Sequence, residues 1–283
     1  MSVVNPENPA NPGSPGSIDP HFIEVLHEAI AAAGAIIQHR FHGSFVVDHK
    51  EGINNLVTEV DKQAEAAIIE IIHRHFPGHT ILSEEAGLLE QHSDYVWFVD
   101  PIDGTVNFAH GIPICCVSIA LRYKQTLLIG AVYNPMMNEL FFAESDKGAT
   151  LNGEPIHVSK KSDFSRACLV TGFPYRMPAF GDHPLKVFER AIMRGLPVRR
   201  LGSAAIDLCW VACGRFDGFW EYNLSPWDIA AGYLIVEEAG GKISNFEGKP
   251  YDVFDKETLA TNGLIHQPLM DLIQNVEREE GII

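Results

Sequence analysis

The sequence predicts a mixed α+β and α/β protein whose two layered halves meet near residue 160. The first half has two helical patterns followed by short β-type segments, which favours an antiparallel sheet that rests on two helices. In the second half strands alternate with helices, which is typical of α/β layers. Hydrophobic residues make up 46% of the 283 residues and charged residues 20%, so we expect a sizeable core rather than a disordered or fibrous chain.

The first residues differ in composition from the rest of the chain. Residues 1–17 contain four prolines and two glycines, which predicts a flexible tail. Asp19 and Pro20 then match a helix start, because a capping residue precedes a proline at the first helical position. Apolar residues recur at helical spacing over 20–43 and again over 58–76, so we expect a helix in each range.

Short β-type segments follow the second helical pattern. The predicted strands of the first half are 79–83, 95–100, 113–123, 127–134 and 139–144. Asn152-Gly153 is a strong signal for a hairpin turn. In the second half the predicted strands are 168–171, 197–200, 217–222 and 242–244, and the predicted helices are 183–194, 203–213 and 226–239. The sequence therefore predicts an N-terminal half over 18–160 and a C-terminal half over 161–283.

The charge of the chain restricts its partners. Lys and Arg number 21 against 37 Asp and Glu, so the net charge is −16 and a polyphosphate backbone is repelled. The five cysteines form no CxxC pair, which favours a reducing, cytoplasmic setting. The longest uncharged apolar stretch, near 112–121, is only half as long as the roughly 20 residues of a membrane helix. We therefore expect neither nucleic acid nor a membrane as a partner, and an anionic substrate would need a local positive element.

A pair of carboxylates is the most informative feature of the sequence. The segment 97–105 predicts an apolar strand that ends in Asp100 and Asp103 and then turns at a glycine into a helix. Mg²⁺ is commonly held by one or two carboxylates together with phosphate oxygens of the substrate. The amides of Gly104 and Thr105 would lie at a helix start, which favours a phosphate. The alternative is an ordinary Asp-rich turn, because short motifs recur by chance.

Three other segments add acids to this pair. Residues 83–85, Ser-Glu-Glu, place carboxylates where a predicted strand ends. Residues 58–61 and 225–228 each have the pattern of a capping box, with Asp61 or Asp228 at the third helical position. Capping alone would explain both acids. An acid in the first helical turn can also direct its second oxygen at a cation, so the two interpretations are compatible.

Taken together, these segments resemble the inositol monophosphatase family. The similar segments are 55–61, 83–85, 100–108 and 227–232, in the same order and at similar spacing, and the resemblance extends over about 20–265. It implies the layered α/β/α/β/α sandwich of the fructose-1,6-bisphosphatase and inositol monophosphatase type, as a homodimer. It also implies Li⁺-sensitive hydrolysis of phosphate monoesters that depends on Mg²⁺, with two or three ions per active site.

The resemblance assigns metal ligands to particular residues. Glu84, Asp100 and the backbone carbonyl of Ile102 resemble the ligands of a first metal. Asp100, Asp103 and Asp228 resemble the ligands of a second metal. Asp100 would therefore bridge the two ions.

The resemblance also assigns catalytic and substrate-binding residues. Glu84 and Thr105 match the pair that activates the attacking water, and Asp61 matches the acid that holds Thr105 in place. Lys50 matches a family lysine near the site, with a solvated loop lysine as the alternative. The residues expected to bind the substrate are Asp103, Gly104, Thr105, Gly202, Ser203, Ala204, Glu221 and Asp228.

The substrate implied by the resemblance is an inositol monophosphate or a similar polyol or sugar phosphate. Fructose-1,6-bisphosphatase, histidinol-phosphatase and nucleotide 3′-phosphatase activities are alternatives within the same chemistry. An alternative of a different class is a regulatory binding protein of the transcription machinery. The complete set of acidic residues favours catalysis, and the net charge of −16 argues against direct contact with RNA.

Overall fold

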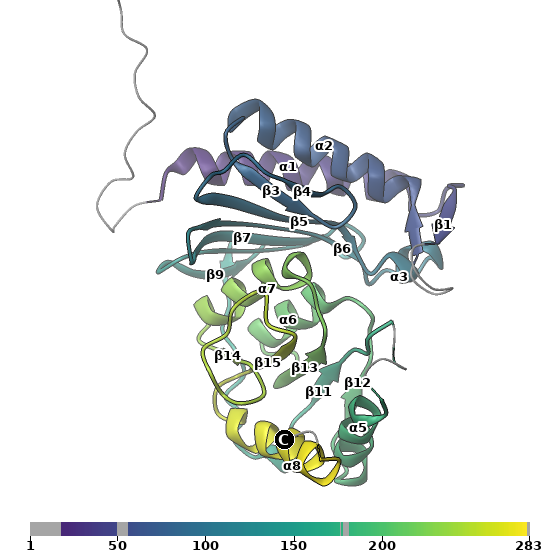
Figure 1. Ribbon diagram of the computed structural model, residues 1–283, viewed down its shortest axis with the longest axis vertical. Helices are drawn as coiled ribbons and strands as arrows, with labels where there is room; N and C mark the ends of the chain where they lie inside the picture. Colours follow the sequence, from purple (N-terminus) through teal and green to yellow (C-terminus); the bar gives the residue numbers. More distant parts are fainter. Residues whose placement is uncertain (1–17, 50–55, 176, 178–180, 282–283) are drawn as a thin grey trace, which may run out of the picture.

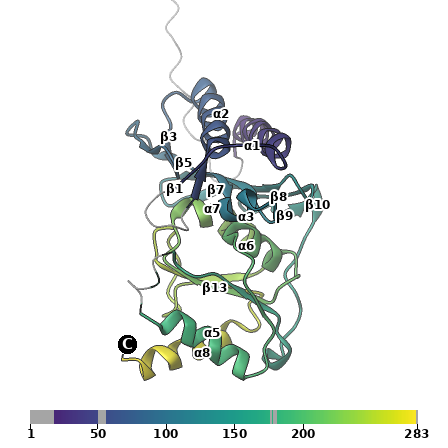
Figure 2. The same ribbon diagram turned by 90° about the vertical axis from the view of Figure 1, so that its right-hand side faces the viewer.

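The polypeptide forms five stacked layers in the computed structural model, which describes residues 18–49, 56–175, 177 and 181–281. From one end to the other these are a helix pair, an eight-stranded sheet, a second helix pair, a five-stranded sheet and a third helix pair (Figures 1 and 2). The predicted α/β/α/β/α sandwich is therefore confirmed. Residues 1–17, predicted as a flexible tail, lie outside the described residues, as does Lys50.

The first layer consists of α1 (Pro20–Arg40) and α2 (Glu59–His75). Both helices begin where the sequence predicts, because Asp19 accepts a hydrogen bond from the His21 amide and Thr58 forms a capping box with Asp61. Among the described residues, α1 is the one helix whose length and composition would suit a membrane span. Its apolar side chains nevertheless pack into the core against β6 and β7.

The eight-stranded sheet has the strand order β10-β9-β8-β7-β6-β5-β3-β4. Its strands are β3 (Thr80–Ser83), β4 (Gly87–Leu89), β5 (Tyr95–Asp103), β6 (Cys116–Tyr123), β7 (Thr126–Asn134), β8 (Glu139–Glu144), β9 (Gly148–Leu151) and β10 (Glu154–Pro155). Every neighbouring pair is antiparallel except β3 and β5, which run parallel. Asn152 and Gly153 both have positive φ, so they form the predicted hairpin turn between β9 and β10. The small strand β4 was not predicted, nor was the antiparallel pair β1 (Val47–His49) and β2 (Leu56–Thr58).

The remaining layers come from the second half of the chain. Helices α6 (Ala204–Ala212) and α7 (Pro226–Glu238) lie between the sheets, and α5 (His183–Met193) and α8 (His266–Glu279) form the outer pair. The five-stranded sheet has the order β12 (Val198–Arg199), β11 (Leu169–Thr171), β13 (Gly218–Tyr222), β15 (Glu257–Thr261) and β14 (Lys242–Ser244). The described residues also form two short helical segments, α3 (Thr105–Ala109) and η1 (Phe164–Arg166). Strand β15, helix α8 and the short segment η1 were not predicted, whereas the other described elements of this half were.

Each sheet divides the apolar side chains between two cores. On β5, Trp97 and Val99 face the first helix pair, whereas Phe98 between them faces the middle helices. The core around Phe98 contains side chains from α6, α7 and both sheets. The middle helices therefore join the two sheets into one stack, and a boundary between halves at residue 160 stays a prediction.

The closest approach between α7 and the large sheet occurs at Gly130 on β7. A Cβ atom at this position would lie only 3.0 Å from the Cα atom of Ala231 and 3.2 Å from its carbonyl oxygen. Both of these atoms are backbone, so a larger side chain could be accommodated only if the helix moved away from the sheet.

We predict that Gly130→Val lowers the stability of the fold by about 1–3 kcal/mol, because overpacking a well-packed core displaces its neighbours. Thermal unfolding followed by circular dichroism measures the change. Gly78→Ala is the matched control, because a Cβ atom there would have no atom within 4 Å, and it should cause no loss. An unchanged melting temperature for Gly130→Val would contradict the close approach of helix and sheet.

Candidate active site

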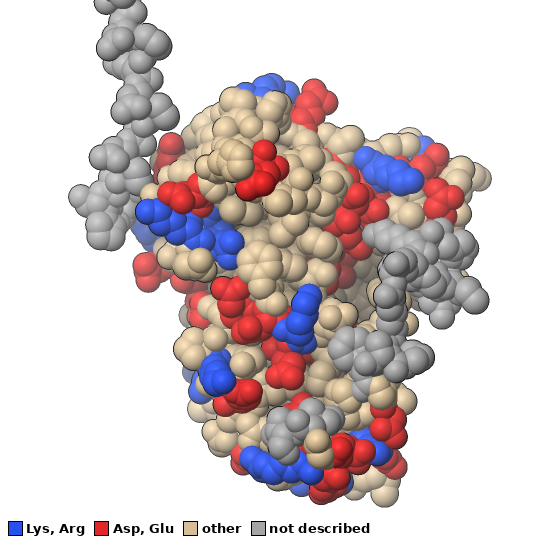
Figure 3. Space-filling view, viewed as in Figure 1, with Lys and Arg blue, Asp and Glu red and all other residues tan. Residues whose placement is uncertain are grey.

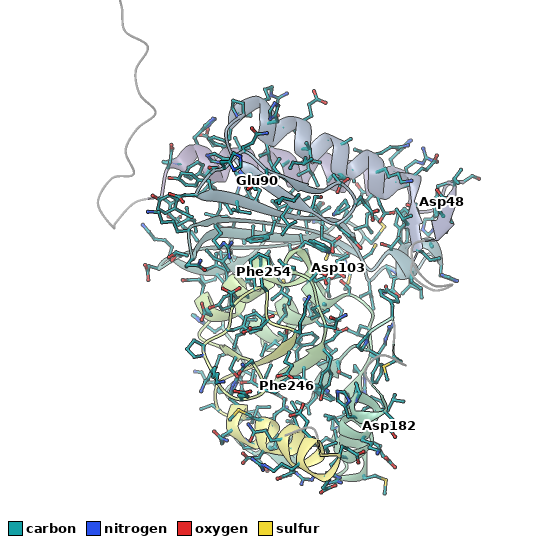
Figure 4. All side chains as sticks on the ribbon, in the orientation of Figure 1. Asp48, Glu90, Asp103, Asp182, Phe246 and Phe254 are labelled. Carbon is teal, nitrogen blue, oxygen red and sulfur yellow. The ribbon has the colours of Figure 1, made fainter. Side chains whose placement is uncertain are left out.

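A cavity opens between the large sheet and the layers below it, where Asp103 lies in Figure 4. It is bordered by the end of β3, the turn from β5 into α3, the start of α6, the end of β13 and the start of α7. Of the predicted catalytic, metal and substrate residues, Asp61 does not line the cavity. The others do: Glu84, Asp100, Ile102, Asp103, Gly104, Thr105, Gly202, Ser203, Ala204, Glu221 and Asp228. The structure thus brings together residues that lie more than 140 positions apart in the sequence.

The turn after β5 positions the central carboxylate pair. The pairing of β5 with β6 is interrupted between Asp100 and Asp103, and the Asp100 carboxylate accepts a hydrogen bond of 3.0 Å from the Ile102 amide. Gly104 has a φ of 90°, and a Cβ atom there would lie 2.8 Å from the Ile114 carbonyl oxygen. Only glycine fits this turn without strain. As the motif predicts, α3 begins directly after it at Thr105.

Asp61 lies behind the cavity wall and serves two hydrogen-bonding roles. Its Oδ2 accepts hydrogen bonds from the amide and the hydroxyl of Thr58, which caps α2. Its Oδ1 accepts a hydrogen bond of 3.0 Å from the Thr105 hydroxyl, which also lies 3.0 Å from the Ile102 carbonyl oxygen. The side chain therefore caps its own helix and orients Thr105, so the capping interpretation alone is incomplete.

Asp103 is held by the first turn of α6. Its Oδ2 accepts hydrogen bonds of 2.7 Å from the Ser203 hydroxyl and from the Ala205 amide. The Ser203 side chain makes no hydrogen bond to its own helix, and the carboxylate of Asp103 meets the free amides of α6 instead. Ser203 was expected to contact the substrate; in the structure its hydroxyl is already engaged with Asp103.

Burial, with mutual repulsion as a further contribution, dominates the electrostatics of the cavity. Burial, followed by the charges of Glu84 and Asp103, raises the pKa of Asp100 well above its usual value. Burial also raises the pKa of Asp103 to about 6 and, together with the charge of Asp103, that of Asp228 to about 8. The side chains of Asp100 and Asp228 are within hydrogen-bonding contact of each other. Such a cluster needs protons or a cation to be stable.

The far side of the cavity carries another buried acid. Burial, with the charges of Asp228 and Asp103, raises the pKa of Glu221 to about 8. A Cβ atom on Gly172 would lie 2.2 Å from either carboxylate oxygen of Glu221, so the glycine leaves room for that side chain. Glu221 therefore belongs to the cavity and is not an exposed strand end.

The donor set suits a hard divalent cation in an open site. In the ranges that the structure describes, no three His, Cys, Asp or Glu side chains are grouped so that they could hold a metal ion by themselves. Mg²⁺ retains several waters and uses one or two carboxylates with substrate phosphate oxygens, whereas structural zinc sites are closed by four nitrogen or sulfur ligands. Carboxylates around an open cavity, with water and substrate oxygens to complete the ligand set, therefore fit Mg²⁺ and not structural zinc.

Three residues of the site were missed by sequence reasoning. Arg200 is the one basic residue among the described residues that line the cavity, and Tyr175 lies at the same wall. Glu65 is buried on α2 and contacts the segment after β3. A signal for Glu65 was present, because it lies one helical turn after Asp61 on the same face.

Comparisons with known proteins assign the chain to a family. The model of the inositol monophosphatase family matches residues 20–278. The chain belongs to the inositol monophosphatase family. The match extends through most of α8, beyond the stretch of about 20–265 over which the resemblance was predicted.

Curated relatives are similar to this chain over most of their own length. The chain is 47% identical to an inositol-1-monophosphatase of Synechocystis, over 88% of this chain and 87% of the relative. It is 42% identical to Nus factor SuhB of Haemophilus influenzae, over 80% and 85%. Family membership and these relatives identify the chain as a phosphatase.

Solved structures share the fold. An inositol monophosphatase from Anabaena is 41% identical, with a TM-score of 0.78 over 90% of this chain and 96% of that chain. Thermotoga maritima IMPase is 35% identical, with a TM-score of 0.83 over 93% and 99%. These similarities confirm the predicted fold type.

We predict that, in the presence of a chelator, the protein is more stable at about pH 5 than at about pH 9. Asp228 has a folded pKa of about 8, whereas an unfolded aspartate titrates near its usual 3.8. Between these values the folded state holds a proton that the unfolded chain has released, so stability rises as the pH falls. Melting temperatures across this range measure the effect.

Asp228→Asn should reduce this pH dependence and raise the melting temperature at the alkaline end by several degrees. Asparagine can still accept the hydrogen bond from the Ser225 amide, so the cap of α7 is preserved. Asp94→Asn, at the opposite end of β5, serves as the control. Equal dependence of the melting temperature on pH for the wild type and Asp228→Asn would show that the pKa of Asp228 is not raised in the folded state.

Proposed function

We propose that the protein is a Mg²⁺-dependent phosphomonoesterase that hydrolyses inositol monophosphate or a similar polyol or sugar phosphate by direct attack of water. The observation that carries the proposal is the convergence of Glu84, Asp100, Asp103 and Asp228 on one cavity. Four acids repel a phosphate unless a cation neutralises them, so the site suits an anionic substrate only together with metal.

The metal ligands follow the resemblance and the contacts of the site. Glu84, Asp100 and the Ile102 carbonyl would hold a first ion, and Asp100, Asp103 and Asp228 a second, with a third ion as an option. When bound, such ions polarise the phosphate ester and lower the pKa of water. One oxygen of Asp103 already accepts hydrogen bonds from α6, and one of Asp228 accepts from the Ser225 amide. These backbone bonds orient each carboxylate before any ion binds.

Glu84 and Thr105 are the residues we propose to activate the water. The Thr105 hydroxyl lies between two acceptors, Asp61 Oδ1 and the Ile102 carbonyl oxygen. When it donates to one of them, its lone pairs remain available to accept a hydrogen bond from water. The Glu84 carboxylate would take the proton, and Asp61 would keep the threonine in this orientation.

The substrate would lie across the cavity from α3 to β13. Its phosphate would lie at the carboxylate cluster near the amides of Gly104 and Thr105. Its hydroxyls would face Glu221, with Gly202, Ser203 and Ala204 along one wall. Water and not a Cys or Ser side chain is the proposed nucleophile. Cys116, whose Sγ lies 3.9 Å from Asp103 Oδ2, is buried, and burial raises the pKa of its thiol.

A second candidate function is a regulatory binding role in transcription. It is favoured by the similarity to relatives that carry the name Nus factor SuhB. Figure 3 shows basic residues interspersed with acidic ones, without a continuous basic surface among the described residues on that face. Together with the charge of −16 this supports contact with protein rather than with nucleic acid.

For the phosphatase, we further propose that the protein is a cytoplasmic homodimer without membrane contact and that Li⁺ inhibits its activity.

A panel assay tests the proposal. Phosphate release is measured with Mg²⁺ on inositol, fructose-1,6-bis-, histidinol and adenosine 3′-phosphates, each also with excess chelator. The proposal expects the highest kcat/KM on the inositol or another polyol phosphate, and no turnover with chelator. Turnover that survives chelation would contradict the metal mechanism, and preference for another substrate would assign one of the alternative activities. Negligible turnover together with a stoichiometric protein partner would favour the regulatory role.

We predict that Glu84→Gln lowers kcat by about 10²–10⁴-fold, which is the usual contribution of a positioned general base. The amide keeps the size of the side chain and removes its basicity, so KM should change less than kcat. Glu90→Gln, an exposed glutamate on the same sheet edge, is the control and should behave like the wild type. A kcat within a few-fold of the wild type would exclude Glu84 from proton transfer.

We predict that Glu221→Gln lowers kcat/KM for inositol monophosphate by about one to two orders of magnitude. A cation bound at Asp103 and Asp228 would favour the ionised form of Glu221, and a hydrogen bond to a charged group contributes about 1.5–3 kcal/mol. Hydrolysis of p-nitrophenyl phosphate, which has no hydroxyls to bind, should change little. Steady-state kinetics on both substrates make the comparison. Equal losses on the two substrates would place Glu221 in the metal or water machinery.

A further inference from the structure

Helix α2 carries a second buried acid one turn after Asp61. Glu65 is 6% exposed and Asp61 is fully buried, and the spacing of four residues places both on one face of the helix. Asp61 holds the hydroxyl of Thr105. Glu65 points to the other side of the same site, toward the segment that carries Glu84.

One oxygen of Glu65 receives three hydrogen bonds from that segment. Its Oε1 accepts from the Ser83 hydroxyl and, at 3.0 Å each, from the amides of Glu85 and Ala86. Ser83 ends β3, and the two amides belong to the turn into β4. The anchored residues therefore flank Glu84 on both sides.

A backbone bond of the turn comes from the neighbouring strand. The Glu84 amide donates a hydrogen bond of 3.1 Å to the Val99 carbonyl, directly before Asp100 on β5. The position of Glu84 relative to Asp100 is therefore set by β5 on one side and by Glu65 on the other. Because one oxygen of Glu65 accepts from three donors of this segment, a single side chain restrains the turn on both sides of Glu84.

We propose that Glu65 is a positioning residue that aims the Glu84 carboxylate at the metal and water of the active site. The proposal rests on the role of Glu84 in the function proposed above. Helix α2 would then orient both water-activating residues, Thr105 through Asp61 and Glu84 through Glu65. A purely structural role, in which Glu65 only satisfies the amides of a buried turn, is the competing explanation.

A double-mutant cycle separates the two explanations. Glu65→Gln, Glu65→Ala and Ser83→Ala are each made in the wild type and in Glu84→Gln. Titration calorimetry with Mg²⁺ alone gives the metal affinity, steady-state kinetics give kcat and KM, and thermal unfolding gives the stability. Glu70→Gln, an exposed change on the same helix, is the control.

We expect Glu65→Ala to weaken Mg²⁺ binding by about 10–100-fold, as for other residues that orient metal ligands, and to lower kcat more than it changes KM. Glu65→Gln keeps an acceptor oxygen and should recover most of both, and Ser83→Ala, which removes one donor of three, should have a small effect. In the Glu84→Gln background these effects should largely disappear, because coupled residues are not additive.

Full additivity would overturn the proposal, since Glu65 would then act on the fold and not through Glu84. If Glu65→Ala fails to fold, the comparison of Glu65→Gln and Ser83→Ala across the two backgrounds decides in the same way. If the wild type releases phosphate but the effects of the Glu65 and Glu84 substitutions are additive, the positioning role of Glu65 is wrong and the proposed function still holds. A wild type that neither binds Mg²⁺ nor hydrolyses phosphate esters would contradict the proposed function and this inference with it.

Discussion

The repulsion between buried carboxylates at the end of β5 is the constraint around which the rest of the structure is arranged. Asp100, Asp103 and Asp228 approach one another in a cavity where burial already disfavours their charged forms. An isolated chain segment would not hold this arrangement, because like charges at short range separate when they can. The packing of the five layers holds these three carboxylates close to one another.

Each acid is secured by hydrogen-bond donors from a different part of the fold. Asp61 accepts from Thr58 at the start of α2, Asp100 from the Ile102 amide, Asp103 from the first turn of α6, and Asp228 from the Ser225 amide at the start of α7. Three of these donors lie at helix starts, where free amides favour negative charge. The packing of helices against two sheets therefore preorganises a site for a cation and a phosphate.

Local signals explain what could be predicted from the sequence. Asp19 with Pro20 and Thr58 with Asp61 define helix starts through contacts within three residues, and Asn152-Gly153 defines a turn by its own backbone preference. These features depend on neighbours in the chain, so the sequence shows them directly. The candidate site was found because several such local motifs occur in an order that resembles a family.

The features that were missed depend on packing between distant segments. The hydrogen bond between Asp103 and Ala205 joins residues 102 positions apart, and that between Glu65 and Ser83 joins residues 18 apart. No local sequence pattern predicts either hydrogen bond. Strand β15 is short and is specified by its neighbours β13 and β14. Helix α8 is different, because its buried Leu269, Ile273 and Val276 recur at helical spacing and could have been recognised.

A crystal structure of the protein grown with Mn²⁺ and inorganic phosphate tests the central claim most directly, because the anomalous signal of Mn²⁺ locates each ion. We expect anomalous peaks among the carboxylates of Glu84, Asp100, Asp103 and Asp228, with the phosphate beside Thr105. Peaks confined to other parts of the surface, or a cavity that takes up neither ion nor phosphate, would contradict the account of this cluster as a metal and phosphate site.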